Sequence, residues 1–147
     1  MKRFSFRLQV VLDMREKELE QRQQEMASIV KTLNSQQQEL DRIHTRENEI
    51  LTSLDTMYNS SNIDILLVSG SKNFLLKLSN DAKNQMKVIE NTKAIMHMKQ
   101  IEINEAYKKV KVLEKLKEKQ EKAYYQKFEK KEAMEIDDLV TTRYKVS

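Results

Sequence analysis

The chain has 147 residues, with one glycine, no proline, no cysteine and no tryptophan; 34% of its residues are charged and its net charge is +4. Average usage would give roughly ten glycines and seven prolines in a chain of this length. Sandwiches, barrels and doubly wound α/β domains need frequent turns rich in such residues, so the composition excludes them and favours long helices. A chain without cysteine has no thiol nucleophile, disulfide or cysteine-based zinc site, and one glycine cannot form a phosphate-binding loop.

An apolar residue recurs at almost every seventh position in the first part of the chain. These positions are Leu12, Leu19, Met26, Leu33, Leu40 and Leu54, with Glu47 as the exception. The second apolar position, three residues further on, is polar at Arg15 and Arg22 and apolar from Ile43 onward. This spacing is typical of a coiled-coil seam and predicts a helix over about 6–58, roughly 80 Å long at the standard rise.

The following segment has the composition of a turn. Residues 59–73 contain the single glycine, Gly70, together with four serines and three asparagines. Such residues favour chain reversal, so we predict a turn over residues 59–72. An apolar patch from Ile63 to Val68 lies within it, and fits either a short capping helix or a loop with a few packed side chains.

A second seven-residue pattern follows the predicted turn. Its apolar positions are Leu75, Ala82, Ile89, Met96, Ile103 and Val110. Beyond Val110 the pattern decays, because Lys117 and Lys131 fall on the seam. Alanine, glutamate, lysine and glutamine dominate there, and these are strong helix formers. The sequence therefore predicts a second helix over about 73–140.

Two long helices with one reversal predict an all-α fold, a long antiparallel two-helix coiled-coil hairpin. We expect residues 1–147 to form a single coiled-coil domain. If Tyr58 lies opposite about Asn73, Leu12 faces the region of Gln120. Two helices bury little surface, so we expect this hairpin to dock onto a larger partner.

Charge supports pairing within one chain. Residues 12–57 hold 6 basic and 10 acidic residues, and residues 73–131 hold 15 basic and 8 acidic residues.

The stretch from Lys108 to Lys131 alone carries ten lysines and four glutamates. It fits a solvated helix face, a docking surface for an acidic protein or a nucleic-acid surface. Predicted pairs of Glu114 with Lys117 and Glu118 with Lys122 favour the first, and the lack of arginine disfavours the last.

No catalytic or metal site is expected. His44 and His97, the only histidines, lie far apart in the predicted register, and the carboxylates belong to solvated helix faces rather than to a water-poor cleft. Aromatic residues gather near the end of the second helix: Tyr124, Tyr125, Phe128 and Tyr144. They fit an exposed interface and packing against the N-terminal apolar residues equally well.

Both ends of the chain resemble one protein family. The opening, FSFRLQVVLDMREKELEQRQQEMA, places Phe6, Arg7, Leu8, Val11, Leu12 and Arg15 at characteristic positions. The ending matches at Leu113, Glu114, Lys115, Leu116, Lys117, Asp137, Asp138 and Arg143. The chain resembles the FliJ family of the flagellar type III export apparatus.

This resemblance implies a cytoplasmic, non-enzymatic component without cofactors, peripheral to the membrane-bound export apparatus and serving flagellum biogenesis, motility and chemotaxis. It implies a stalk-like rod that docks in the ring of the hexameric flagellar export ATPase and promotes its assembly and activity. Further implied partners are the membrane export gate protein and export chaperones, and no nucleic acid is expected. The ring-facing residues would be Phe6, Arg7, Leu8, Val11, Leu12, Arg15, Lys115, Lys117, Tyr124 and Phe128.

Three alternatives stay open at this point. A stalk subunit of another secretion system or of a rotary ATPase would have the same architecture. A hairpin chaperone would instead bind clients through the apolar patch from Ile63 to Val68. A basic coiled coil could also bind nucleic acid, with a strong dependence on salt.

Overall fold

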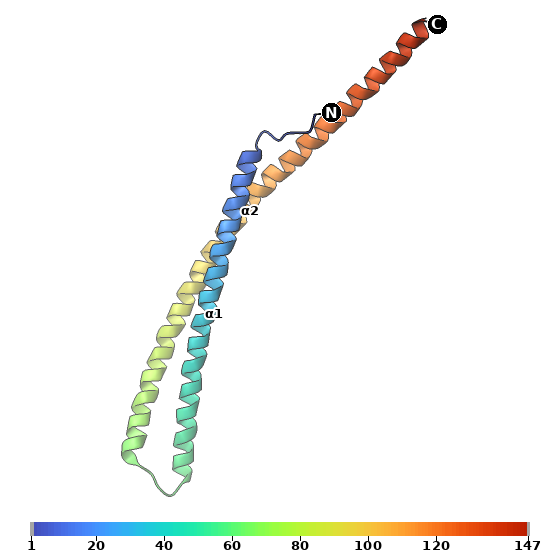
Figure 1. The fold of residues 1–147 in the computed structure, drawn as a ribbon. Helices are drawn as coiled ribbons and strands as arrows, with labels where there is room; N and C mark the ends of the chain where they lie inside the picture. Colours follow the sequence, from blue (N-terminus) through green and yellow to red (C-terminus); the bar gives the residue numbers. More distant parts are fainter. Residues whose placement is uncertain (1, 147) are drawn as a thin grey trace. The chain divides into compact units, whose positions relative to one another are not determined.

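The computed structural model describes residues 2–146 of the chain, and its side chains through Tyr144. It contains two helices, α1 over Gln9–Asn59 and α2 over Ile65–Val146, and no strand in the described part. Figure 1 shows the two helices running in opposite directions on either side of a short connection. The predicted all-α antiparallel helical hairpin is confirmed.

The turn is shorter than predicted, because α2 begins at Ile65 rather than near residue 73. The Asp64 carboxylate accepts hydrogen bonds from the backbone N–H groups of Leu66 (3.1 Å) and Leu67 (3.4 Å), so it caps the helix. The Ser60 hydroxyl donates a 2.9 Å hydrogen bond to the Met57 carbonyl at the end of α1. Capping at both ends confines the connection to residues 60–64.

Gly70 does not form the turn. It lies inside α2 with a negative φ, and a Cβ atom placed on it would meet no atom within 4 Å. The glycine therefore has no conformational role in the reversal. The apolar patch after the turn is helical from Ile65 onward, and its first residues Ile65 and Leu66 are exposed.

The shorter turn also changes the pairing of the helices. Leu12 packs in one cluster with Val110, not with the region of Gln120. The prediction of that register was wrong because it placed the start of the second helix too late along the chain.

The chain divides into two compact units. The terminal unit comprises residues 1–22 and 102–147, and the turn unit comprises residues 23–101. In the terminal unit the buried residues Phe6, Leu12 and Val110 form the core, flanked by Phe4, Leu19, Leu113 and Leu116. In the turn unit the buried apolar residues are Leu54, Leu78, Ala82 and Ile89.

Both cores are thin. No described side chain is less than 2% exposed, because a layer of two helices always leaves one side open to water. Thr92 is the buried polar residue of the turn unit, and its hydroxyl donates a hydrogen bond to the Val88 carbonyl at 3.1 Å.

The last part of α2 has no α1 segment beside it. Every described side chain from residue 129 to residue 144 is exposed. We name residues 129–146 the C-terminal arm; its end is the red part of Figure 1. Exposed apolar residues of the arm include Met134, Ile136, Leu139, Val140 and Tyr144.

Candidate docking surface of the terminal unit

The net charge of the chain is concentrated in the terminal unit. Residues 1–22 and 102–131 of this unit hold 16 basic and 10 acidic residues, a net charge of +6. The remaining residues of the unit, 132–147, hold 2 basic and 4 acidic residues, a net charge of −2. The turn unit holds 9 of each sign and is neutral. Long-range attraction of an acidic partner would therefore act on the paired termini.

Few lysines of this unit are neutralised within the chain. Lys111 forms an ion pair with Glu114 at 3.1 Å, and this hydrogen bond raises the pKa of Lys111 above its usual value. Glu114 thus pairs with Lys111, not with Lys117 as predicted. Four exposed or half-exposed lysines have no ion-pair partner among the described residues: Lys108, Lys109, Lys115 and Lys117.

An apolar groove lies beside Lys108 and Lys109. It has a volume of about 340 Å³ and is lined by Val11 and Arg15 from α1 and by Lys108, Lys109, Val112 and Leu113 from α2. Val112 is 67% exposed although it is aliphatic. The groove therefore combines an apolar floor with a basic rim, which suits an amphipathic helix with acidic flanks.

The N-terminal segment is fixed against α2 by aromatic contacts. The ring centroids of Phe4 and Tyr124 lie 5.7 Å apart, and Tyr125 packs edge-on against Tyr124 at 5.5 Å. The Tyr124 hydroxyl donates a 2.7 Å hydrogen bond to the carbonyl of Lys2. For Tyr124, packing against the N-terminal residues is therefore the arrangement that the structure adopts.

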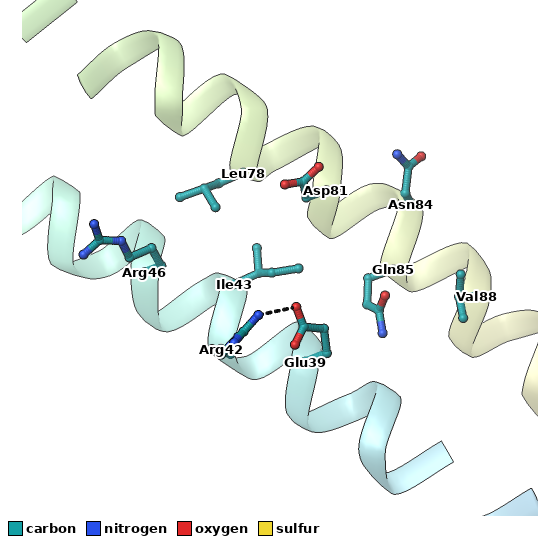
Figure 2. Close-up of a pocket in the computed structure, with 9 residues that line it drawn as sticks. All are labelled: Glu39, Arg42, Ile43, Arg46, Leu78, Asp81, Asn84, Gln85 and Val88. Atoms are coloured by element: carbon teal, nitrogen blue, oxygen red, sulfur yellow. Dashed lines mark hydrogen bonds and ion pairs between the residues drawn. The ribbon is translucent and has the colours of Figure 1, made fainter. Parts of the chain in front are cut away.

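A second groove lies in the turn unit. Figure 2 shows its lining, with Glu39, Arg42, Ile43 and Arg46 on α1 and Leu78, Asp81, Asn84, Gln85 and Val88 on α2. Its volume is about 610 Å³, and an ion pair of 2.9 Å joins Arg42 to Glu39. Charges of both signs line it, so this groove does not select a partner by charge.

The described residues contain no group of three or more histidine, cysteine or acidic side chains able to hold a metal ion. The Nδ1 atom of His44 lies 3.6 Å from the carboxylate of Glu47 on the same helix. Among the described residues, no third potential metal ligand joins this pair.

A comparison with protein-family models bears on the open alternatives. The family model described as "Flagellar FliJ protein" matches residues 4–147, nearly the whole chain.

The chain belongs to the FliJ family.

The predicted resemblance is confirmed, and with it a role in flagellar protein export through type III secretion. FliJ proteins are non-enzymatic components of that export apparatus, so this chain is one as well. Comparisons with curated proteins and with solved structures found no match. In the part of this FliJ chain that the structure describes, no helix has the length and apolar character needed to cross a membrane.

The structure divides the predicted ring-facing residues of this FliJ chain into two groups. Phe6 and Leu12 are buried and hold the two helices together, so a partner cannot contact them directly. The others keep exposed or half-exposed side chains: Arg7, Leu8, Val11, Arg15, Lys115, Lys117, Tyr124 and Phe128. All of them belong to the terminal unit.

Four residues of the groove were not among the predicted ring-facing residues. Lys108, Lys109, Val112 and Leu113 line it beside the predicted Val11 and Arg15. Val112 was the available signal, because an aliphatic residue off the predicted seam and among lysines has no place in the packing of the hairpin.

Proposed function

We propose that the terminal unit docks in the ring of the hexameric flagellar export ATPase, and that it promotes the assembly and activity of this ring. The observation that carries the proposal is the basic-rimmed apolar groove at Val11 and Val112, in the unit that holds all of the net charge. Membership of the FliJ family supports the same export apparatus as the setting.

Contact with acidic ring surfaces would be favourable because Lys108 and Lys109 have no ion pair among the described residues to break. Lys108 and Lys109 are exposed beside the groove. Their attraction to acidic groups acts over about a Debye length, roughly 8 Å at physiological salt, and the apolar floor then excludes water. Any effect on hydrolysis is allosteric, because the chain supplies no reacting group and shifts the ring only through unequal affinity for its states.

We also propose that the chain binds the membrane export gate protein and export chaperones. This would place the chain in the cytoplasm, peripheral to the membrane-bound apparatus. The neutral turn unit, with its mixed-charge groove, is the surface we assign to these contacts because the basic surface is then occupied by the ATPase.

Titration of the purified chain into its cognate export ATPase tests the main proposal. We expect faster ATP hydrolysis and a larger hexamer fraction. The triple variant Arg7→Glu/Lys108→Glu/Lys109→Glu should need about tenfold more protein for half-maximal stimulation, since each exposed charge contact contributes about 0.2–1 kcal/mol and reversal adds repulsion.

The matched control is Lys83→Glu/Lys87→Glu, which reverses two exposed lysines of the turn unit. It should stimulate like the wild type. A wild-type chain that changes neither turnover nor oligomerisation of the ATPase would overturn the proposal.

A hairpin chaperone is the second candidate, and one observation favours it. Ile65 and Leu66 are 79% and 85% exposed at the start of α2. Replacing both by serine should abolish the protection of an unfolded client from aggregation if the tip binds clients. The same variant should leave stimulation of the ATPase unchanged, so the two functions are separable.

A further inference from the structure

A second stripe with seven-residue spacing runs along the exposed side of α2. Its members are Val112, Lys119, Gln126, Ala133 and Val140, and all five are exposed. Side chains seven residues apart lie nearly in line on a helix, with a drift of about 20° per seven residues that supercoiling around a partner helix removes. The contacts to α1 come from other positions, Val110 and Leu113 among them. This side of α2 is therefore not covered by α1, although it carries valines at both ends.

The stripe is symmetric about Gln126. Val112 and Val140 lie equally far from it along the chain, and so do Lys119 and Ala133. An antiparallel copy of α2 placed with its Gln126 beside this Gln126 would bring each Val112 against a Val140. The two amides at the centre would be able to donate and accept hydrogen bonds to each other.

The charges on the two sides of Gln126 are opposite. Residues 108–119 hold six lysines and two glutamates, a net charge of +4. Residues 133–144 hold three acidic residues and one arginine, a net charge of −2. The antiparallel alignment opposes these segments and places Lys115 across from Asp137, whereas a parallel alignment would oppose like charges.

We propose that the exposed side of α2 binds a second copy of this chain, antiparallel, with a two-fold axis at Gln126. The charges favour this occupant because the acidic segment that complements the basic one is found on the same helix. One helix cannot fold back on itself to join them, so a second copy of this chain is needed to bring the two segments together. A two-fold contact closes on itself and gives a dimer rather than a filament.

We expect the contact between the two copies to be weak, because its apolar area is small. Its apolar part consists of two Val112–Val140 pairs and the two Ala133 side chains, and Lys119 interrupts the stripe. This is smaller than a standard protein interface, so we expect a weak dimer whose dissociation constant rises with salt. The dimer covers part of the basic surface, so it competes with docking to an acidic partner. The inference goes beyond the proposed function and does not rest on it.

The cysteine-free chain permits a direct test by introduced cysteines. Gln126→Cys places two thiols beside each other at the two-fold axis. Gln120→Cys is the matched control, since Gln120 is also an exposed glutamine of α2 but lies off the stripe. At about 100 μM under mild oxidation, we expect Gln126→Cys to form the disulfide dimer at least tenfold faster than the control. Equal rates for the two variants would overturn the proposal.

A charge exchange supplies an independent measurement. Lys115→Glu and Asp137→Lys should each weaken dimerisation about fivefold in sedimentation equilibrium, and the double variant should recover the wild-type value. Both side chains are exposed, so helical content by circular dichroism should not change. A wild-type chain that stays monomeric to millimolar concentration, or a double variant without recovery, contradicts the proposal. Because the assay contains this chain alone, its failure leaves docking to the ATPase untouched.

Discussion

The Tyr124 hydroxyl donates a 2.7 Å hydrogen bond to the main-chain carbonyl of Lys2, which joins two residues 122 positions apart in the sequence. The ring of Tyr124 also packs against Phe4. Together with the buried Phe6, these contacts hold against α2 the non-helical segment that carries Lys2, Arg3 and Arg7. Tyr124 therefore helps to position part of the basic docking surface.

Removing this tyrosine should release the N-terminal segment without unfolding the hairpin. Tyr124→Phe loses only the hydrogen bond and should lower the free energy of unfolding by about 1 kcal/mol or less. Tyr124→Ala loses the ring contact too and should speed limited trypsin cleavage after Arg3 and Arg7 several-fold. Tyr58→Phe, at an exposed tyrosine of the turn unit, is the control and should change neither quantity. Unchanged cleavage in Tyr124→Ala would show that other contacts hold the segment.

Gly70→Ala should stabilise the chain. The glycine lies within α2, its φ is not positive, and a Cβ atom would meet no neighbour. Alanine in the interior of a helix is favoured over glycine by about 0.8–1 kcal/mol. Urea unfolding followed by circular dichroism should show a higher midpoint. A lower midpoint would mean that Gly70 serves the reversal after all.

Asp64→Ala should destabilise the start of α2. The carboxylate caps the N–H groups of Leu66 and Leu67, and loss of such a cap costs about 0.5–2 kcal/mol. Asp64→Asn keeps an oxygen acceptor and should recover most of that loss. Exchange of the amides of residues 65–68 measures the effect locally, and equal exchange in the alanine and asparagine variants would rule out the cap.

Gln36→Leu should also stabilise the turn unit. The side-chain oxygen Oε1 of Gln36 is shielded from water and has no hydrogen-bond partner. Gln85 donates its 2.9 Å bond to the main-chain carbonyl of Gln36, and the substitution keeps this acceptor. Removing an unpaired amide and adding apolar contact should raise the free energy of unfolding by about 1 kcal/mol. Gln37→Leu, at the exposed neighbouring position, serves as the control and should have little effect.

Periodicity predicted the packing of this chain well. Leu12, Leu54, Ala82, Ile89 and Val110 were all assigned to the two seams from spacing alone, and all five are buried. The reason is physical: with two helices and no breaker inside them, seven-residue spacing determines the contact face almost completely.

The turn is harder to predict from the sequence, because the single glycine, Gly70, points to a reversal later in the chain than the observed one. Glycine favours turns on average, yet here the capping carboxylate of Asp64 decides where α2 begins. The error then shifted the expected partner of Leu12. In the candidate site, the charged residues were predictable as a basic surface. The position of Val112 off the predicted seam was a usable signal, but the α1 residues beside it follow only from the pairing of the helices.

No described side chain is fully buried, so the stability of the chain depends strongly on the partners that bind it. Any partner that binds the folded chain and not the unfolded one adds RT ln(1 + [L]/Kd), about 2.7 kcal/mol at a hundredfold excess over Kd. Native proteins are stable by only about 5–15 kcal/mol, so this increment is a substantial share of a typical free energy of unfolding. Its melting temperature is then a measure of occupancy, and thermal shift can report each binding partner without a label.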